Sequence, residues 1–398
     1  MQFYPSLPTF ADDNCPWLDR LIAWASVCSG KDSREGRLFL LEEAARLFKD
    51  LGASLEILEN ESDAPMLVAR LFPKAPKKIL LFGHLDTVFG KNHPFQTVSR
   101  DTEKLKGPGV CDMKSGVLIL YESLKKHLKE GLRQSLNQSS GQESNLGFTI
   151  VLNTDEEIGS IISGPLWKNL APGHFCALGF EPAFSSKEHP RALVTARMGS
   201  CNLVVSFKGK SAHAGRNPQE GASAIHAACR WWSELESKTT HIKGLFVNVG
   251  KIEGGTASNV VADFAKLEIN IRAKTQEVLD QFLKIAQGTS TTYLPPLHVD
   301  LEIKSQRPAK PANASSLELA FLTKQLASDL HINLSLVETA GVCDGNNIQA
   351  LGIPTLDNLG AVGGGLHSDQ EWIELSSIDE QIALVSALLE RLASLTKL

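Results

Sequence analysis

The stretch KKILLFGHLD, residues 77–86, joins an apolar run directly to the polar residues His84 and Asp86. A short apolar run that stops at polar residues predicts a buried strand. The runs FTIVLNTDEE and CALGFEP end in the same way, and amphipathic helical patterns lie between such runs, as in LFLLEEAARLFKDLGA (38–53) and after Asp112. Alternating strands and helices predict an α/β fold with a mostly parallel sheet that helices cover on both faces.

A second pattern begins near Arg197. Strand and helix patterns follow one another there in the order βαββαβ, which is typical of a small α+β domain of the split-βαβ, ferredoxin-like kind. The Pro-rich segment SQRPAKPA comes next, and helical patterns then resume. We therefore predict a main domain at 1–196 and 307–398, interrupted by an inserted domain at 197–306. The polar stretch 131–147 lacks periodicity and is expected to be an exposed loop.

Composition and charge limit the classes of function. Hydrophobic residues make up 42% of the 398 residues and charged residues 21%, as in ordinary globular proteins. The net charge of -5 offers no general attraction for nucleic acid. No apolar run reaches the ~20 residues that cross a bilayer, and the N-terminus lacks a signal-peptide pattern, so we expect a cytoplasmic protein without a membrane partner. The seven scattered cysteines include no C-x-x-C pair, so any metal must bind to His and carboxylate side chains.

Polar residues with metal-binding chemistry follow the predicted strands of the main domain. They are His84 with Asp86, Asp112, Glu156 with Glu157, Glu181, and His367. Ligands of open α/β sheets gather at the carboxyl ends of strands, so these residues can converge. Singly, His84 could be a hydrogen-bonded histidine, Asp112 a helix N-cap, and the two glutamates solvated loop residues. Together they supply the nitrogen and oxygen ligands that a pair of zinc ions requires.

Five segments, in order, carry a resemblance to a known family. The segments are GHLDTV, GPGVCDMKSG, NTDEEIGS, FEP and GLHSDQEW, and they resemble the signatures of the di-zinc aminoacylase and carboxypeptidase metallopeptidases. That family includes acetylornithine deacetylases, succinyl-diaminopimelate desuccinylases and bacterial glutamate carboxypeptidases. The inserted segment, with KSAHAGRNPQEGASAI and GGTASNVV, resembles the lid or dimerisation domain of the family, which implies a homodimer.

The resemblance implies a role for each site residue. His84 and Glu181 would bind one zinc ion, Glu157 and His367 the other, and Asp112 would bridge the two. Glu156 would be the catalytic carboxylate, and Asp86 would accept a hydrogen bond from His84. The cofactors would be two Zn²⁺ per chain, for which Co²⁺ can substitute.

The inserted domain contributes three further candidates by the same resemblance. His213 in SAHAG would bind the scissile carbonyl oxygen, often across a dimer, and its simpler interpretation is a capping or surface histidine. Asn259 and Arg272 match positions that face the substrate, and Arg272 suits a terminal carboxylate because a guanidinium binds it with two hydrogen bonds. The alternative for Arg272 is a surface strand residue. Cys343, near the site in GVCDGN, could be an adventitious metal ligand, and the GGG run 363–365 either cradles a substrate carboxylate or forms a flexible loop.

The expected activity is zinc-dependent hydrolysis of an amide that releases an amino acid with a free carboxylate. Among the branches, HLDTVFGKNHPF, NTDEEIGS and LGFEPA are most similar to the glutamate carboxypeptidases. An N-acyl amino acid deacylase such as acetylornithine deacetylase is the alternative, since it shares every catalytic residue. A catalytically inactive binding protein on the same fold should lack a ligand or Glu156, and a metallophosphoesterase should carry a phosphate loop or a basic cluster.

Overall fold

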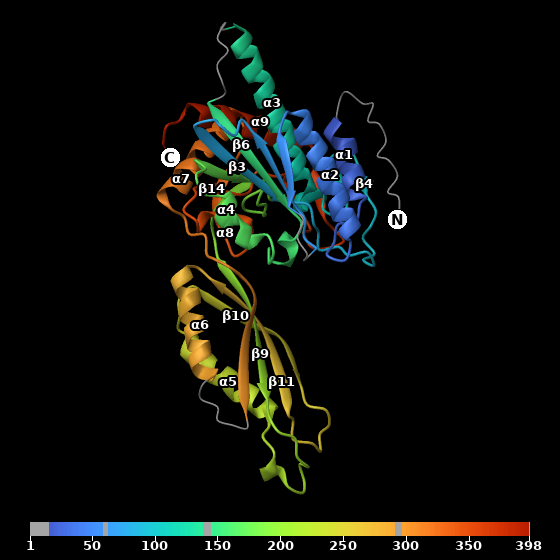
Figure 1. The fold of residues 1–398 in the computed structure, drawn as a ribbon, viewed down its shortest axis with the longest axis vertical. Helices are drawn as coiled ribbons and strands as arrows, with labels where there is room; N and C mark the ends of the chain where they lie inside the picture. The colour runs from blue at the N-terminus through green and yellow to red at the C-terminus, as the bar shows by residue number, and fades with distance from the viewer. Residues whose placement is uncertain (1–15, 59–62, 138–144, 291–296, 398) are drawn as a thin grey trace. The chain divides into compact units, whose positions relative to one another are not determined.

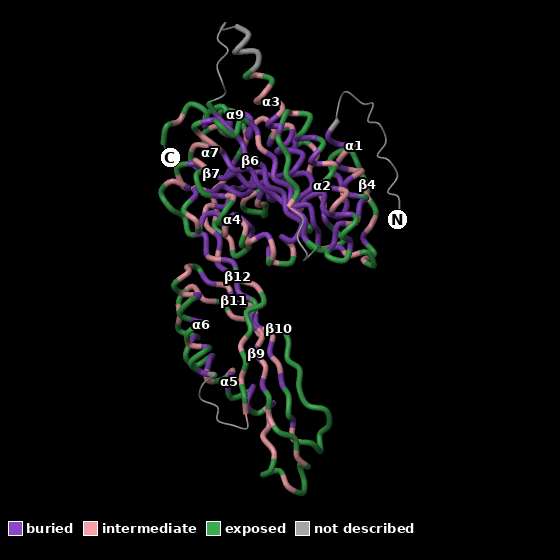
Figure 2. The backbone as a smooth tube through the Cα atoms, viewed as in Figure 1, coloured by how far each residue is buried: buried purple, intermediate pink, exposed green. Residues whose placement is uncertain are grey.

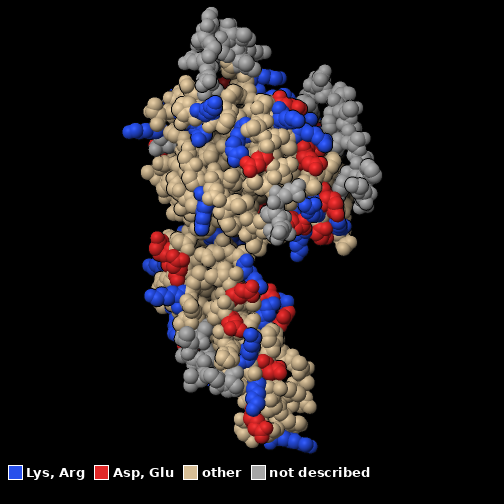
Figure 3. All heavy atoms as spheres, in the orientation of Figure 1, with Lys and Arg blue, Asp and Glu red and all other residues tan. Residues whose placement is uncertain are grey.

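The computed structural model describes residues 16–58, 63–137, 145–290 and 297–397. The chain divides into two compact units. Unit 1 comprises Met1–Thr195, Ala312–Glu338 and Cys343–Leu398, and unit 2 comprises Ala196–Pro311 and Thr339–Val342. None of the helices within the described residues is both long and apolar enough to span a bilayer. Acidic and basic side chains are interspersed on the visible face of each unit (Figure 3).

Unit 1 is built on a six-stranded sheet, as the alternation of strands and helices predicted (Figure 1). Its strands, in spatial order, are β1 (Ser54–Leu58), β2 (Met66–Leu71), β6 (Leu146–Asn153), β3 (Lys77–His84), β7 (Cys176–Gly179) and β14 (Thr355–Leu356). The pairs of β3 with β6, β3 with β7, and β7 with β14 are parallel. The pairs of β1 with β2 and β2 with β6 are antiparallel, which the sequence did not predict.

Helices cover both faces of this sheet, in agreement with the prediction. Alternate residues of β3 point to opposite faces: Ile79 and Leu81 join one hydrophobic cluster, and Leu80 and Phe82 join another. The first cluster includes residues of α1 (Pro16–Ala25), α2 (Arg34–Asp50), α3 (Ser115–Asn137), α7 (Ala314–Asp329) and α9 (Leu375–Ser394). The second includes residues of α4 (Trp167–Leu170) and α8 (Asp344–Gln349). The central strands are therefore buried on both sides (Figure 2).

Short strands complete unit 1. A four-stranded sheet has the order β15 (Gly363–Gly364), β16 (Trp372–Glu374), β5 (Lys104–Lys106) and β4 (Ser99–Arg100). A further pair joins β8 (Ala192–Arg197) to β13 (Ser335–Thr339).

The glycine run 363–365 forms strand β15 and the turn after it. Gly365 has φ +68°, and a Cβ there would lie 2.2 Å from the Gln370 carbonyl oxygen, so the tight turn requires glycine.

The expected loop at 131–147 begins as helix instead. Helix α3 continues to Asn137, because Leu, Arg and Gln in this stretch are good helix formers even without apolar periodicity. The loop prediction was therefore wrong for 131–137, and also for 146–147, where strand β6 begins. The rest of the stretch, up to residue 144, lies outside the described residues.

Unit 2 has the predicted order βαββαβ. Its elements are β9 (Gly199–Lys208), α5 (Ala224–Thr239), β10 (Leu245–Gly254), β11 (Phe264–Ala273), α6 (Gln276–Ser290) and β12 (His298–Arg307). The four strands form an antiparallel sheet in the order β10-β11-β9-β12. Alternate residues of β11 are buried beneath the two helices, where Phe207, Trp231 and Phe282 form part of a separate core.

Candidate metal centre

Parallel strand pairing brings predicted site residues to one edge of the main sheet. Strand β3 ends at His84, opposite Asn153 at the end of β6. On the other side of β3, Phe82 pairs with Gly179 of β7, and Glu181 follows shortly after. Because parallel strands present their carboxyl ends at the same edge, the loops after β3, β6 and β7 meet there.

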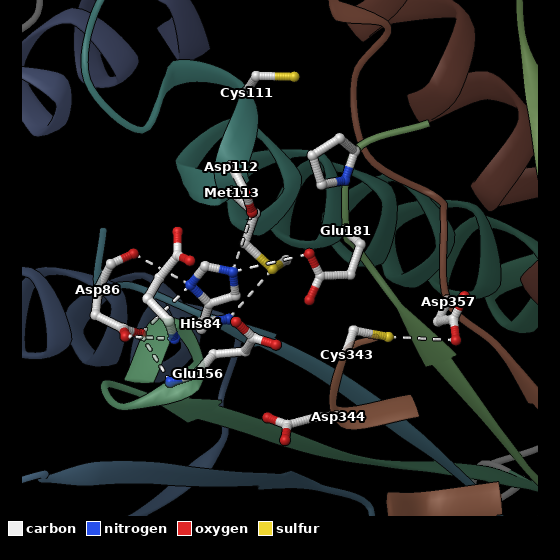
Figure 4. Close-up of polar contacts among 12 residues, drawn as sticks. His84, Asp86, Cys111, Asp112, Met113, Glu156, Glu181, Cys343, Asp344 and Asp357 are labelled. Atoms are coloured by element: carbon white, nitrogen blue, oxygen red, sulfur yellow. Dashed lines mark hydrogen bonds and ion pairs between the residues drawn. The ribbon is translucent and has the colours of Figure 1, made fainter. Parts of the chain in front are cut away.

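His84 lies at the centre of this group. Its side chain is 1% exposed, and its Nε2 lies 3.2 Å from Asp112 Oδ1 and 3.8 Å from Glu181 Oε2. Figure 4 shows these two carboxylates directed at the imidazole from different elements. Ligand atoms of His84, Asp112 and Glu157 all lie within 4.8 Å of one another. Imidazole nitrogen and carboxylate oxygens at this spacing fit a borderline cation such as zinc.

Asp112 faces two histidines with its two oxygens. While Oδ1 approaches His84 at 3.2 Å, Oδ2 lies 3.4 Å from His367 Nε2. The same His367 nitrogen lies 3.1 Å from Glu157 Oε2. Two groups therefore meet at Asp112: His84 with Glu181, and His367 with Glu157.

Asp86 orients the groups around it. The Nδ1 of His84 lies 3.1 Å from the Asp86 carbonyl oxygen and 3.4 Å from its Oδ1. When Nδ1–H donates to Asp86, the Nε2 lone pair is directed toward Asp112 and Glu181, where it can bind a cation. The Asp86 carboxylate also accepts the backbone N–H of Glu156 at 3.2 Å and that of Glu157 at 2.9 Å.

Glu156 begins a short 3-10 helix, Glu156–Ile158. The residue is 8% exposed, and its side chain extends into the same group of carboxylates (Figure 4). The clustered cation-binding atoms come from His84, Asp112 and Glu157, so Glu156 is next to that cluster without belonging to it. A carboxylate in this place can take up a proton beside a bound cation.

The electrostatics reflect a dense set of acids around two imidazoles. Burial opposes ionisation of Asp112, but hydrogen bonds with His367 and His84 outweigh it and lower its pKa. Burial and the charge of Asp112 raise the pKa of Glu157 to about 7. Hydrogen bonds with Asp112 and Glu157 raise the pKa of His367 to about 11. Burial disfavours a charged His84, yet Glu181 and Asp112 raise its pKa well above the usual value. The imidazoles of His84 and His367 therefore hold protons at nitrogen atoms that could bind a cation.

Two cysteine side chains, Cys343 and Cys111, lie near the candidate ligands (Figure 4). Cys343 directs its thiol to Asp357, with Sγ 3.4 Å from Oδ2. In Figure 4 the Cys111 side chain extends away from the His84 ring, and burial raises the pKa of its thiol.

His213 and Asn259 lie together in unit 2. A bridge pairs His213 with Val260, and the N–H of Ala214 donates to the Asn259 carbonyl oxygen at 3.0 Å. Both residues are exposed. The Nδ1 of His213 accepts the backbone N–H groups of Gly215 and Arg216 at 3.1 and 3.2 Å. An accepting Nδ1 places the proton on Nε2, which can then donate to a carbonyl oxygen.

Arg272 lies on β11 of unit 2 and is half-buried. Its Nε donates to Asn270 Oδ1 at 3.2 Å, and its Nη1 donates to the Ala340 carbonyl oxygen at 3.3 Å. Burial and the neighbouring Arg307 guanidinium lower its pKa. The three predicted substrate-binding residues thus belong to unit 2, whereas the predicted metal ligands and Glu156 belong to unit 1.

Two buried carboxylates near the cluster were not among the predicted site residues. Glu371 accepts backbone N–H groups of the segment that carries Asp112. Asp344 accepts Ser160 Oγ at 2.5 Å through Oδ1, which supports the loop after Glu157. Both acids were visible in quoted segments, GLHSDQEW and GVCDGN, but nothing local in those segments reveals which backbone or side chain each would contact.

Comparison with known proteins shows which proteins this chain is similar to. The model of the M20 peptidase dimerisation domain matches residues 195–296. An M20 family metallo-carboxypeptidase from Sulfolobus solfataricus superimposes with a TM-score of 0.73 at 15% identity, over 97% of this chain and 100% of the other. The aminopeptidase PepT from Bacillus cereus gives a TM-score of 0.72 at 19% identity, over 94% and 98%. The inserted part of the chain therefore matches the M20 dimerisation domain, and the chain as a whole is similar to M20 metallopeptidases and deacylases, a family that implies a metal cofactor.

Two curated relatives are similar in sequence. Carboxypeptidase G2 from Pseudomonas sp. (strain RS-16) is 27% identical over 334 residues, which is 81% of this chain and 76% of that protein. Acetylornithine deacetylase from Vibrio parahaemolyticus is also 27% identical, over 285 residues, which is 67% of this chain and 68% of that protein. The expected resemblance of this chain to M20 metallopeptidases and deacylases is therefore confirmed.

Proposed function

We propose that this protein hydrolyses an amide bond with two bound zinc ions and releases an amino acid that carries a free carboxylate. The observation that carries the proposal is the position of Asp112, whose two oxygens face His84 and His367 separately. A carboxylate so placed can bridge two cations, with Glu181 completing one set of ligands and Glu157 the other. Zinc ions bound there would polarise the scissile carbonyl group and acidify a water molecule.

The chain's own groups would then handle the proton. Glu156, which is buried beside the cluster, takes a proton from the attacking water and delivers it to the leaving nitrogen. Asp86 keeps His84 in the orientation that binds the cation, because it accepts the Nδ1–H. Since the Asp86 carboxylate accepts the N–H of Glu156 while its backbone carbonyl oxygen faces His84 Nδ1, one residue aligns both the ligand and the base.

Unit 2 would bind the substrate. We propose that it is a lid and dimerisation domain at about 197–306, and that it brings His213, Asn259 and Arg272 to the substrate, with His213 acting from a partner subunit. The Nε2–H of His213 would donate to the scissile carbonyl oxygen. The guanidinium of Arg272 would bind the carboxylate of the released amino acid with two charge-assisted hydrogen bonds.

The glutamate carboxypeptidase branch is the favoured specificity. Carboxypeptidase G2 matches more of this chain, 81%, than acetylornithine deacetylase, 67%, at the same identity. An N-acyl amino acid deacylase is the second candidate, because acetylornithine deacetylase is also similar to this chain. A non-catalytic binding protein is disfavoured, since both imidazoles, the carboxylates around them and Glu156 are all present.

A substrate panel tests the proposal. The purified protein would be assayed against N-acyl-glutamates, N-acetylornithine and dipeptides, each with added zinc, with cobalt and with chelator. The expected result is hydrolysis of an acyl-glutamate that chelator abolishes and zinc or cobalt restores. Hydrolysis of N-acetylornithine alone would move the protein to the deacylase branch. Full activity in metal-free protein would contradict the mechanism.

A further inference from the structure

We infer that Glu371 is a positioning residue that holds the Asp112 carboxylate in place for metal binding. The inference rests on the proposed function, since it gives Glu371 a part in the metal centre. Glu371 is 1% exposed. Its Oε2 accepts the N–H of Gly109 at 3.0 Å, and its Oε1 accepts those of Cys111 at 2.8 Å and Asp112 at 2.9 Å.

The segment that Glu371 holds has an irregular backbone. Between Val110 and Lys114, Asp112 (φ -113°, ψ 94°) and Met113 (φ -133°, ψ 38°) depart from helical geometry. Buried N–H groups in such a segment need acceptors from elsewhere in the fold. One of the donors is the N–H of Asp112 itself, so the acceptor sets where the Asp112 Cα stands and where its side chain begins.

The element that carries Glu371 also carries His367. Both residues lie in the hairpin between β15 and β16, where Gly363 pairs with Ile373. The Glu371 carbonyl oxygen also accepts the N–H of Gly107 at 3.2 Å, which anchors the hairpin to the start of the Asp112 segment. A single hairpin thus supplies one imidazole directly and holds the shared carboxylate through Glu371. The spacing between His367 and Asp112, 3.4 Å from Nε2 to Oδ2, is therefore fixed within one structural unit.

A role in stability alone makes a different prediction from a positioning role. If Glu371 only satisfied buried N–H groups, its loss would lower the melting temperature of the metal-free protein, and metal affinity would stay unchanged wherever the variant is folded. If Glu371 positions Asp112, metal affinity must fall even in a fully folded variant, because the two groups of ligands no longer share a fixed carboxylate.

The test compares Glu371→Gln and Glu371→Ala with the wild type. Zinc affinity is measured by competition with a chromogenic chelator on metal-free protein, well below the melting temperature found by circular dichroism. The Gln variant keeps one acceptor oxygen but turns an NH₂ group toward a backbone donor, so zinc affinity should fall about tenfold. The Ala variant removes every acceptor and should lose roughly 100-fold. Glu374→Gln, on β16, is the matched control and should bind zinc as the wild type does.

The outcomes separate this inference from the proposed function. A folded Glu371→Gln variant that binds zinc within twofold of the wild type overturns the positioning role, whether or not Glu371→Ala folds. Zinc affinity that decreases in the order wild type, Glu371→Gln, Glu371→Ala supports the positioning role. Failure of the wild type itself to bind zinc would instead contradict the proposed function.

Discussion

Asp86 accepts the backbone N–H of Glu157 through Oδ2 at 2.9 Å, so the carboxylate that follows β3 also sets the backbone that follows β6. The same side chain lies beside His84 Nδ1. The ends of β3 and β6 are distant in sequence. The contacts of Asp86 hold them together where their candidate ligands converge. The site is therefore a property of the sheet edge and of the polar contacts across it.

Substitution Asp86→Asn tests this connection. The amide keeps only one of the two oxygens that accept the N–H groups of Glu156 and Glu157, and it removes the negative charge 3.4 Å from His84 Nδ1. Zinc affinity and turnover should each fall about 10-fold to 100-fold. Competition with a chelator and steady-state kinetics measure the two effects.

The matched control is Asp101→Asn. Asp101 also accepts two backbone N–H groups, those of Glu103 and Lys104, but it is exposed at the β4–β5 turn. It should leave zinc affinity and turnover unchanged. Equal effects from both substitutions would show that the Asp86 result reflects general damage.

Glu156→Gln should separate proton transfer from metal binding. The amide cannot take up a proton, so turnover should fall by roughly 100-fold to 10,000-fold while metal content stays close to that of the wild type. Asp112→Asn should instead reduce metal occupancy, because a neutral amide bridges two cations poorly. Metal analysis and turnover are measured on both variants, and an identical outcome for the two would refute this division of roles.

Metal binding should release protons. In the metal-free protein the pKa of His367 is about 11, raised by Asp112 and Glu157, so this imidazole is protonated at pH 7 and must lose its proton to bind a cation. Zinc affinity should accordingly rise with pH and fall as the solution becomes more acidic. Calorimetric titration in buffers of different ionisation enthalpy counts the protons, and an enthalpy independent of the buffer would argue against protonated ligands.

Arg272→Ala should weaken binding of an acyl-glutamate but spare its α-amide, which has no carboxylate to pair with the guanidinium. The Michaelis constant for the acid should rise about 10-fold to 100-fold. Both substrates on both proteins form a double-mutant cycle that removes general damage to unit 2. Equal losses for acid and amide would make Arg272 a structural residue of β11.

The main sheet could be predicted because its central strands are long enough to carry a pattern. The run at 77–86 is apolar up to His84, and the buried strand ends there as expected. The β15 and β16 strands, of two and three residues, are too short for any periodicity, so the hairpin that carries His367 was not foreseen. Strand β1 was missed because it is an exposed edge strand without a continuous apolar run, whereas β2 is buried and apolar and its antiparallel direction depends on its pairing with β1 and β6.

Only part of the candidate site could be predicted from the sequence. Residues such as His84 and Asp112 stand in segments whose order carries the family resemblance. Glu371 stands in one of those segments too, but its contacts are with the backbone of Gly109, Cys111 and Asp112, which no side-chain pattern encodes. A contact between a side chain and a distant backbone depends on the tertiary fold alone.

The central claim, that Asp112 bridges two metal ions, is tested most directly by a crystal structure of the zinc-loaded protein with anomalous diffraction at the zinc edge. Two anomalous peaks are expected about 3.5–4 Å apart. One peak should lie among His84, Glu181 and Asp112, and the other among His367, Glu157 and Asp112. A single peak at full zinc saturation, or two peaks without Asp112 between them, would contradict the account.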